Sequence, residues 1–300
     1  MVDEIWIDAA RQRELPVRIR WPTTDQPVPA GGRPVVLFSH GLGGTVAGGQ
    51  AWGEAWCAAG FVVVHLQHPG SDLPALRRQA RGFGDQAGLR QAASPQQLVA
   101  RLEDVVFVLD ELTRRHAAGD SRWSLARPTG VGMSGHSFGA HTTLGMAGQR
   151  YPGHPGIREP RLAAFVAFSP TLPARGDAAQ AFERLTRPLL CVTGTRDDDV
   201  AGVGATPERR IGVFAALPAG RKAHLVLEDA DHMTFAGQTG AAVEIVPRHP
   251  SSRALQTRHH ALVSAVTTDW WRAHLMGDAS ALQSLARPPG LAPGDRWQVG

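Results

Sequence analysis

A serine between glycines is the residue of this sequence best suited to chemistry. Ser137 is the centre of Gly135-His136-Ser137-Phe138-Gly139, a G-x-S-x-G pattern that follows an apolar stretch and precedes the small residues 140–147. A strand, a sharp turn and a helix in this order lift the hydroxyl out of a sheet and point the N–H groups of the helix N-terminus at the atom it attacks. Glycines in such a turn leave room for closely packed backbone. The alternative is a glycine-rich loop with a surface serine.

A serine hydroxyl becomes a useful nucleophile when a base takes its proton, and histidine suits this task near neutral pH. An acid behind the histidine fixes its tautomer and stabilises the imidazolium. In a sheet with this kind of turn, the partners follow in the order Ser, then Asp or Glu, then His. Asp197 and His232 follow Ser137 in that order, each just after an apolar run. We therefore predict Ser137 as nucleophile, His232 as base and Asp197 as the acid, with Asp198 and Asp199 as alternative acids.

Other histidines compete for the role of base. His40 and His68 also follow apolar runs, and His40 fits better as part of the glycine-rich stretch that begins beside it. His136 is too near Ser137 in the sequence to face it as a base. His232, in a turn after the last apolar run, remains the preferred candidate.

Attack on an ester carbonyl creates an oxyanion, and backbone N–H groups aimed at that oxyanion are effective catalysts. The N–H of Phe138, directly after the nucleophile, is one candidate donor. The N–H of Leu42, in the glycine-rich stretch 39–44, is the other. We also predict an apolar wall for the acyl or alcohol part of a substrate, with core packing as the alternative role. Its candidate residues are Trp52, Met233 and Phe235.

The elements that would position these residues are visible as hydrophobic patterns. Partial two-residue alternation over 3–8 and 15–21 predicts a hairpin of half-exposed strands. Continuous apolar runs, typical of parallel strands buried on both faces, occupy 35–38, 61–66, 162–168, 188–193 and 223–227. Helices are expected over 51–59, from Ser94 through the apolar stripe that ends at Leu112, and over 258–275, with a further helix after Ser137.

Buried strands that alternate with helices predict an α/β fold: a mostly parallel sheet with helices on both faces and antiparallel strands at the N-terminus. In such sheets, ligands bind beyond the carboxyl ends of the strands. The stretches 39–44, 135–139, 194–199 and 231–233 all fall there. We expect a single domain over 1–287. Within it, the arginine-rich segment 73–93 is expected to be a surface excursion or part of a cap, and 288–300 a loose, Pro/Gly-rich tail.

Composition narrows the classes of function. The chain has 43% hydrophobic and 19% charged residues and a net charge of +4, as in an ordinary soluble globular protein. Its arginines are scattered, which argues against a nucleic-acid partner. No apolar run is long enough to span a membrane, and the N-terminus lacks the pattern of a signal peptide. We expect a cytoplasmic location, with a secreted form that has lost its signal peptide as the alternative.

The sequence contains no motif that supports a bound metal or cofactor. H-E-x-x-H and C-x-x-C are absent, as is the Walker A pattern. Gly130, Gly132 and Gly135 match the letters of the dinucleotide-binding fingerprint, but no acid follows at the usual distance. Cys57 and Cys191 provide no disulfide framework. We expect no metal and no cofactor.

Four blocks of sequence carry a family resemblance: Phe38-Ser39-His40-Gly41-Leu42-Gly43, the G-x-S-x-G pattern, Gly194-Thr195-Arg196-Asp197 and Asp231-His232-Met233. They resemble the α/β-hydrolase superfamily and, more closely, the dienelactone-hydrolase-like and platelet-activating-factor-acetylhydrolase-like serine esterases. Dienelactone hydrolases themselves use a cysteine nucleophile, so the serine favours a carboxylic ester over a lactone.

The resemblance implies cofactor-free hydrolysis of a small-molecule ester with a short acyl group, through an acyl-enzyme. Other activities of the same triad remain open: a phospholipid-type acetylhydrolase or lipase, a polyester hydrolase, an acyltransferase or a peptidase. A non-catalytic binding module is the alternative of a different class. The sequence does not indicate the oligomeric state.

Overall fold

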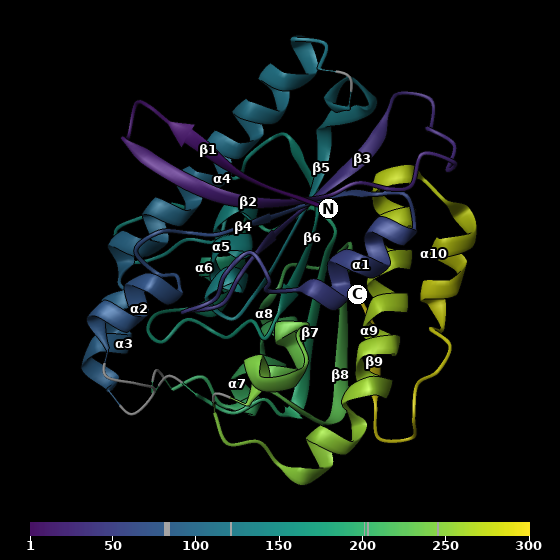
Figure 1. Cartoon of the computed structure of the whole chain (residues 1–300). Helices are drawn as coiled ribbons and strands as arrows, with labels where there is room; N and C mark the ends of the chain where they lie inside the picture. Colours follow the sequence, from purple (N-terminus) through teal and green to yellow (C-terminus); the bar gives the residue numbers. More distant parts are fainter. Residues whose placement is uncertain (81–84, 121, 201, 203, 245) are drawn as a thin grey trace.

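The protein is described by a computed structural model that covers residues 1–80, 85–120, 122–200, 202, 204–244 and 246–300. Its described residues form a nine-stranded sheet with the order β1-β2-β4-β3-β5-β6-β7-β8-β9 (Figure 1). The strands are β1 (Val2–Asp8), β2 (Arg13–Arg20), β3 (Arg33–Ser39), β4 (Val62–Leu66), β5 (Ala126–His136), β6 (Leu162–Phe168), β7 (Leu189–Arg196), β8 (Lys222–Asp231) and β9 (Arg296–Val299).

The sheet is mostly parallel, as the alternation of strands and helices predicts. Strands β4, β3, β5, β6, β7 and β8 are neighbours in parallel register. The predicted N-terminal hairpin, β1 and β2, joins the edge of the sheet in antiparallel register through β4. Every residue of β3 and β4 is buried, because helices cover both faces of these strands.

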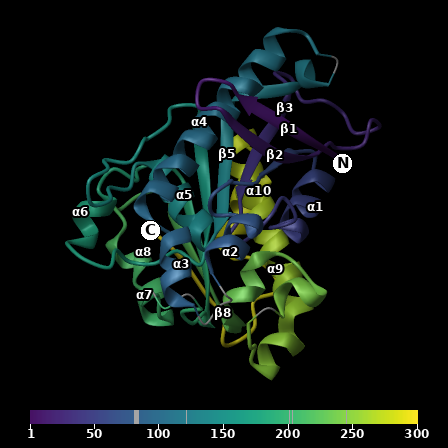
Figure 2. The ribbon, with the colours of Figure 1, turned by 60° about the vertical axis from the view of Figure 1, so that its left-hand side comes forward.

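Helices cover the two faces of the sheet in separate layers (Figures 1 and 2). One face packs against α1 (Gln50–Ala58), α9 (Pro250–Met276) and α10 (Ala279–Ala286), with Trp52, Trp56 and Trp271 in its core. The other face packs against α4 (Pro95–Ala117) and α5 (Phe138–Ala147). Shorter helices complete the described chain: α2 (Leu73–Gln79), α3 (Gln86–Ala92), α6 (Ala178–Phe182), α7 (Pro207–Ile211), α8 (Val213–Ala216), and the 3₁₀ turns η1 (Trp123–Leu125), η2 (His232–Ala236) and η3 (Gly240–Val243).

Two helix starts show how local sequence sets these boundaries. Helix α4 begins as predicted, because the Ser94 side chain accepts a hydrogen bond from the Gln97 N–H and Pro95 occupies the first turn. Helix α9 begins eight residues before the predicted position 258. There Pro250 again starts the helix, and the His249 side chain accepts from the Ser251 N–H.

The expectation of a loose tail over 288–300 is wrong for its last residues. Strand β9 pairs antiparallel with β8 and closes that edge of the sheet. The Trp297 indole donates to the Leu285 carbonyl at 2.9 Å, and Arg258 forms an ion pair with Asp295. The prolines and glycines that suggested a tail lie in the turn before the strand, where proline and glycine are favoured.

Segment 73–93 is largely helical in its described part, while its residues 81–84 lie outside the described residues. Leu76 of α2 is buried with Leu89 and Ala92 of α3, and Leu42 of the glycine-rich loop packs against them. A Cβ atom on Gly43 would lie 2.4 Å from a Leu76 methyl group. The segment therefore supports the loop after β3.

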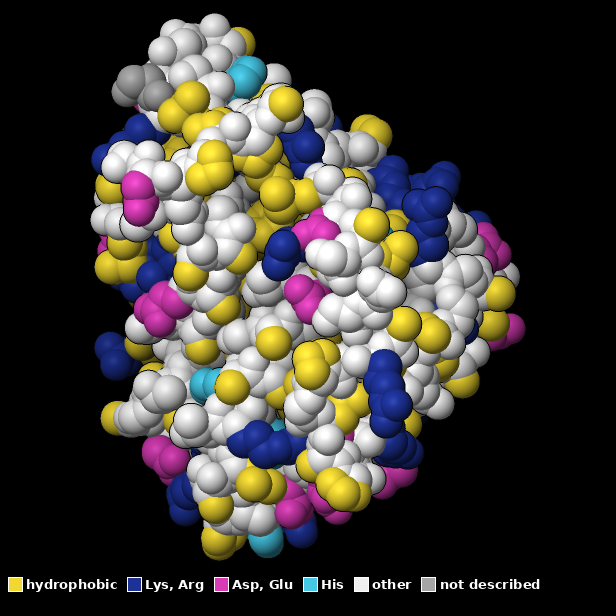
Figure 3. Space-filling view, turned by 90° about the vertical axis from the view of Figure 1, so that its right-hand side faces the viewer, with side chains coloured by type: hydrophobic (Ala, Val, Ile, Leu, Met, Phe, Trp, Pro, Cys, Tyr) yellow, Lys and Arg dark blue, Asp and Glu magenta, His cyan; other side chains and the backbone are white. Residues whose placement is uncertain are grey.

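The surface over α1, α9 and α10 carries Lys and Arg side chains interspersed with Asp and Glu, among scattered apolar groups (Figure 3). Mixed charge of this kind is typical of a solvated surface. Among the described residues, no helix is long and apolar enough to cross a membrane.

Candidate active site

Ser137 lies at the turn between β5 and α5, beyond the carboxyl end of the strand. Its backbone has φ 57° and ψ −114°, a region that side chains other than glycine rarely occupy and that marks functional turns. The Ser137 N–H donates to the Phe168 carbonyl at 2.9 Å, which ties the turn to the end of β6. A Cβ atom on Gly135 would lie 2.3 Å from the Gly139 carbonyl oxygen, and one on Gly139 would lie 2.0 Å from that of Ser39. Both glycines are required for this close packing.

Asp197 and His232 meet at the ends of β7 and β8. His232 Nδ1 lies 2.7 Å from Asp197 Oδ1, and both side chains are buried. Because a carboxylate can only accept, Nδ1 carries the hydrogen, and Nε2 of the neutral ring is left as the basic atom. The two alternative acids are placed elsewhere: Asp198 is exposed, and Asp199 accepts from the Gly204 N–H.

Arg210 of α7 is a third partner of the Asp197 carboxylate. Its Nε lies 3.0 Å from Oδ1, and the Thr193 hydroxyl donates to Oδ2 at 2.7 Å. Burial alone would raise the pKa of Asp197, but the charge of Arg210 and the hydrogen bond from His232 outweigh it and hold that pKa below its usual range. Asp197 is therefore an anion at neutral pH. Sequence patterns did not identify Arg210 or Thr193.

Ser137 and His232 line the same cavity, which has a volume of about 230 Å³. Leu42 and Met233, two of the predicted oxyanion-hole and wall residues, also line it. The remaining lining is mostly small or apolar: Phe38, His40, Gly41, Gly43, Gly44, Thr45, Gly48, Leu73, His136, Val200, Ala236, Gln238 and Ala242.

Trp52 and Phe235, the other two predicted wall residues, are buried in the core and are not among the residues that line this cavity. The Trp52 ring stacks on Phe168 with centroids 5.4 Å apart, and its indole N–H donates to the Phe235 carbonyl at 3.3 Å. Trp52 thus holds turn η2, which carries both His232 and Phe235.

A second set of contacts holds η2 in place. The Asp231 carboxylate accepts from the Thr234 N–H at 2.9 Å, and Arg248 Nε donates to the same carboxylate at 2.8 Å. His136 Nε2 lies 3.0 Å from the His232 carbonyl oxygen, and the two imidazole rings pack with centroids 4.6 Å apart. Because a carbonyl only accepts, His136 donates here and fixes the backbone of His232.

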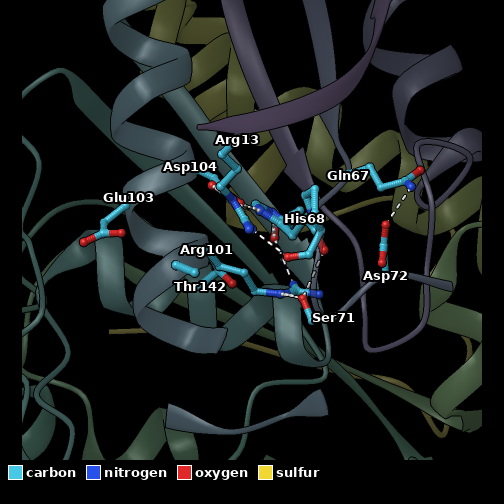
Figure 4. Close-up of polar contacts among 12 residues, drawn as sticks. Arg13, Gln67, His68, Ser71, Asp72, Arg101, Glu103, Asp104 and Thr142 are labelled. Carbon is cyan, nitrogen blue, oxygen red and sulfur yellow. Dashed lines mark hydrogen bonds and ion pairs between the residues drawn. The ribbon is translucent and has the colours of Figure 1, made fainter. Parts of the chain in front are cut away.

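A second Ser-His-Asp chain lies behind the glycine-rich loop. Ser39 Oγ is 2.9 Å from His68 Nε2, and His68 Nδ1 is 2.9 Å from Asp104 Oδ2. All three side chains are buried, and none of the three lines the cavity. Arg13 donates to both Asp104 oxygens, and Figure 4 shows Arg13, His68 and Asp104 together. We interpret this chain as structural, because no substrate reaches its serine.

At neutral pH, His68 and Asp104 of this second chain each have one defined charge state. Burial, followed by the charge of Arg101, lowers the pKa of His68 to about 4, so His68 is neutral at pH 7. Burial alone would raise the pKa of Asp104, but hydrogen bonds from His68 and Arg13 lower it to about 2. His68 therefore donates through Nδ1 to the Asp104 anion and accepts the Ser39 hydroxyl at Nε2.

The other sequence motifs occupy ordinary structural positions. Gly130, Gly132 and Gly135 lie within β5, and not in the strand-to-helix turn that a dinucleotide-binding fingerprint needs. Cys57 and Cys191 are both free thiols. In the described ranges, no three His, Cys, Asp or Glu side chains are grouped so that they could hold a metal ion.

Comparison with known proteins identifies the fold and leaves the activity open. No protein-family model matches the chain, and no curated protein sequence matches it. The structure is similar to that of a ferulic acid esterase from Streptomyces cinnamoneus, with a TM-score of 0.60 and 20% sequence identity over 99% of this chain and 94% of that one. Together with the mostly parallel sheet, this similarity shows that the chain has the predicted α/β-hydrolase fold.

Proposed function

We propose that this protein is a serine hydrolase that cleaves carboxylic esters with short acyl groups through a covalent acyl-enzyme. The hydrogen bond of 2.7 Å between His232 Nδ1 and Asp197 Oδ1, beside a cavity that His232 shares with Ser137, carries the proposal. The name of the structurally similar ferulic acid esterase supports ester hydrolysis as the reaction class.

The reaction begins with attack of Ser137 Oγ on the ester carbonyl carbon, while His232 Nε2 takes the hydroxyl proton. Asp197 holds the His232 ring and stabilises the imidazolium that forms. The N–H groups of Leu42 and Phe138 donate to the oxyanion of the tetrahedral intermediate. As the intermediate collapses, the C–O bond to the alcohol breaks, and His232 returns its proton to the leaving oxygen.

Hydrolysis of the acyl-enzyme repeats these steps with water. His232 takes a proton from the water as its oxygen attacks the acyl carbon, and the same two N–H groups bind the second oxyanion. Ser137 leaves, regains its proton from His232, and the carboxylic acid is released. In this cycle the chain's own groups carry out each proton transfer.

The size of the cavity supports a short acyl group. Its volume of about 230 Å³ lies below the roughly 300–1,000 Å³ of pockets that hold drug-sized ligands. Its apolar lining suits an alkyl chain, and Met233 and Leu42 lie at that lining. We therefore expect acetyl and butyryl esters to be better substrates than esters of longer acyl chains.

Turnover of p-nitrophenyl acetate, butyrate and octanoate tests the proposal. We expect the octanoate to react more slowly than the butyrate, and Ser137→Ala to lose at least about 10³-fold in kcat/KM. Ser134→Ala is the matched control, because Ser134 lies on the same strand and its hydroxyl donates to the Leu37 carbonyl. A fluorophosphonate should label the wild type on Ser137. Equal turnover by Ser137→Ala and the wild type would exclude the proposed mechanism.

A further inference from the structure

Arg101 of α4 is a buried cation whose hydrogen bonds go mainly to one loop. The side chain has no exposed surface. Its Nε donates to Ser71 Oγ at 2.8 Å, and its Nη1 donates to the His40 carbonyl at 2.7 Å (Figure 4 shows the arginine reaching from α4 to Ser71). Buried charges are usually paired with an opposite charge, so a guanidinium directed at neutral backbone groups needs a reason.

The guanidinium also contacts the peptide unit that carries the Leu42 N–H and the side chain of Phe138, the two parts of the proposed oxyanion hole. Arg101 Nη2 donates to the Gly41 carbonyl at 3.4 Å, and that carbonyl belongs to the same peptide unit as the Leu42 N–H. The guanidinium carbon lies 4.3 Å from the centroid of the Phe138 ring. A single side chain therefore contacts both the Gly41–Leu42 peptide unit and the Phe138 ring, and it is not among the residues that line the cavity.

His40 adds a second donor to the Gly41 carbonyl. The backbone N–H of His68 donates to His40 Nε2 at 3.0 Å. In the neutral His40 ring, Nε2 is therefore the acceptor and Nδ1 carries the hydrogen. Nδ1 lies 2.6 Å from the Gly41 carbonyl oxygen and donates to it. Burial, followed by the charge of Arg101, lowers the pKa of His40 well below its ordinary value and keeps the ring in this neutral form.

The two donors to the Gly41 carbonyl affect the Leu42 N–H, which lies at the opposite edge of the same peptide unit. They fix the plane of the Gly41–Leu42 peptide so that its N–H points away from Arg101. A cationic donor on the carbonyl also polarises the unit, which strengthens the N–H as a donor. Burial lowers the pKa of Arg101 to about 9, with partial compensation from Asp104 and Asp72, so the guanidinium stays charged at neutral pH.

We propose that Arg101 is a positioning residue for the oxyanion hole, which orients and polarises the Gly41–Leu42 peptide so that the Leu42 N–H binds the tetrahedral oxyanion. The proposal rests on the proposed ester hydrolysis. Arg101 acts through Leu42 and touches no substrate. Its removal should therefore weaken binding of the oxyanion more than binding of the uncharged ester.

A trifluoromethyl ketone with a short alkyl chain separates these effects. Ser137 adds to its carbonyl carbon and creates a stable oxyanion, so its inhibition constant reports on the oxyanion hole. We expect Arg101→Met to lower kcat/KM for p-nitrophenyl butyrate by about 10- to 100-fold. Affinity for the ketone should fall by a similar factor, with a change in KM of no more than about threefold.

Arg33→Met is the matched control. Arg33 is also a buried arginine that donates to a backbone carbonyl, that of Gln26, but it lies at the start of β3 and the loop of Leu42 follows the end of that strand. Thermal unfolding of both variants measures the structural cost of losing a buried arginine. Arg33→Met should keep the wild-type ketone affinity within about threefold.

The outcomes distinguish the two proposals. If the wild type shows no turnover that depends on Ser137, the proposed function fails, and with it the role of Arg101. If the wild type does turn over the ester but Arg101→Met and Arg33→Met bind the ketone equally well, the role of Arg101 alone is refuted. Should Arg101→Met not fold, Arg101→Lys replaces it, because an ammonium cannot reproduce the planar set of donors. Wild-type ketone affinity in a folded Arg101→Lys would refute the proposal equally.

Discussion

The contact between Asp197 and Arg210 leads to a prediction about substitution of Asp197, the proposed catalytic acid. We expect Asp197→Asn to lower kcat/KM for an ester by about 10⁴-fold, because the neutral amide no longer stabilises the imidazolium. The overall geometry can survive this change. The asparagine oxygen can accept from His232, and its amide can donate to the Thr193 hydroxyl. Arg210 Nε also donates to the backbone carbonyl of Asp197 at 2.9 Å, a bond that the substitution leaves in place.

Part of this loss comes from Arg210 itself. His232 Nδ1 and Arg210 Nε lie 2.7 and 3.0 Å from the same oxygen, so these two nitrogens are at most 5.7 Å apart. Without the carboxylate, a protonated His232 faces a guanidinium at about 6 Å. At an effective dielectric constant of about 20, the repulsion is about 3 kcal/mol, or about 100-fold in rate.

The double variant Asp197→Asn/Arg210→Gln tests this value. Glutamine removes the positive charge but can still donate to a backbone carbonyl. We expect the double variant to hydrolyse p-nitrophenyl butyrate 10- to 100-fold faster than Asp197→Asn, in line with the estimated repulsion of about 3 kcal/mol. Asp198→Asn is the control for position, because Asp198 is the adjacent, exposed carboxylate. All variants are compared as folded protein, verified by circular dichroism.

Two results would contradict the reasoning. If the double variant is as slow as Asp197→Asn or slower, Arg210 does not act on the imidazolium through its charge. If Asp198→Asn or Asp199→Asn loses activity and Asp197→Asn does not, the acid has been assigned to the wrong residue.

Three further predictions concern stability and reactivity. Gly139→Ala should lower the free energy of unfolding by more than about 3 kcal/mol in urea titrations, because its Cβ would lie 2.0 Å from the Ser39 carbonyl oxygen; a smaller loss would show that the turn can open. Burial lowers the pKa values of His68 and His141 to about 4. The unfolded chain therefore takes up protons below about pH 6.5 before the folded one does, and urea titrations should show stability falling from pH 6.5 to pH 4 by about 1.4 kcal/mol per pH unit for each histidine; a flat profile would contradict the burial of these rings. Burial raises the pKa of Cys191 to about 12, so iodoacetamide should modify this thiol after unfolding and leave it intact in the folded protein, as peptide mass analysis can show.

Much of the sheet follows from sequence patterns, because buried parallel strands are continuous apolar runs. The predicted run 162–168 coincides with β6, the run 188–193 begins one residue before β7, and the run 223–227 lies within β8. The order Ser, Asp, His then directs attention to the ends of those strands. The meeting of Asp197 and His232 depends on the spatial adjacency of β7 and β8, which their apolar runs alone do not give.

The arginines of the site were missed for a physical reason. Arg101 and Asp104 occupy the buried face of α4 between Leu98 and Val105, where a helical pattern predicts apolar residues. Charged residues at such positions are a usable signal, since they are buried only with partners. Arg210 offered a weaker signal: it lies on a helix of five residues, too short for a hydrophobic pattern. Strand β9 was missed because it is short and mostly exposed.

The buried chain of Ser39, His68 and Asp104 has a consequence for recognising enzymes by geometry. A search template built from the three side-chain types and the His–Asp hydrogen bond would find two sets of residues in this fold. They differ in whether a small molecule can arrive and in whether the serine backbone is held in a strained turn. Ser39 ends an ordinary strand inside the protein. There the same three side-chain types that are proposed to break esters at Ser137 link this strand through His68 to helix α4 by hydrogen bonds.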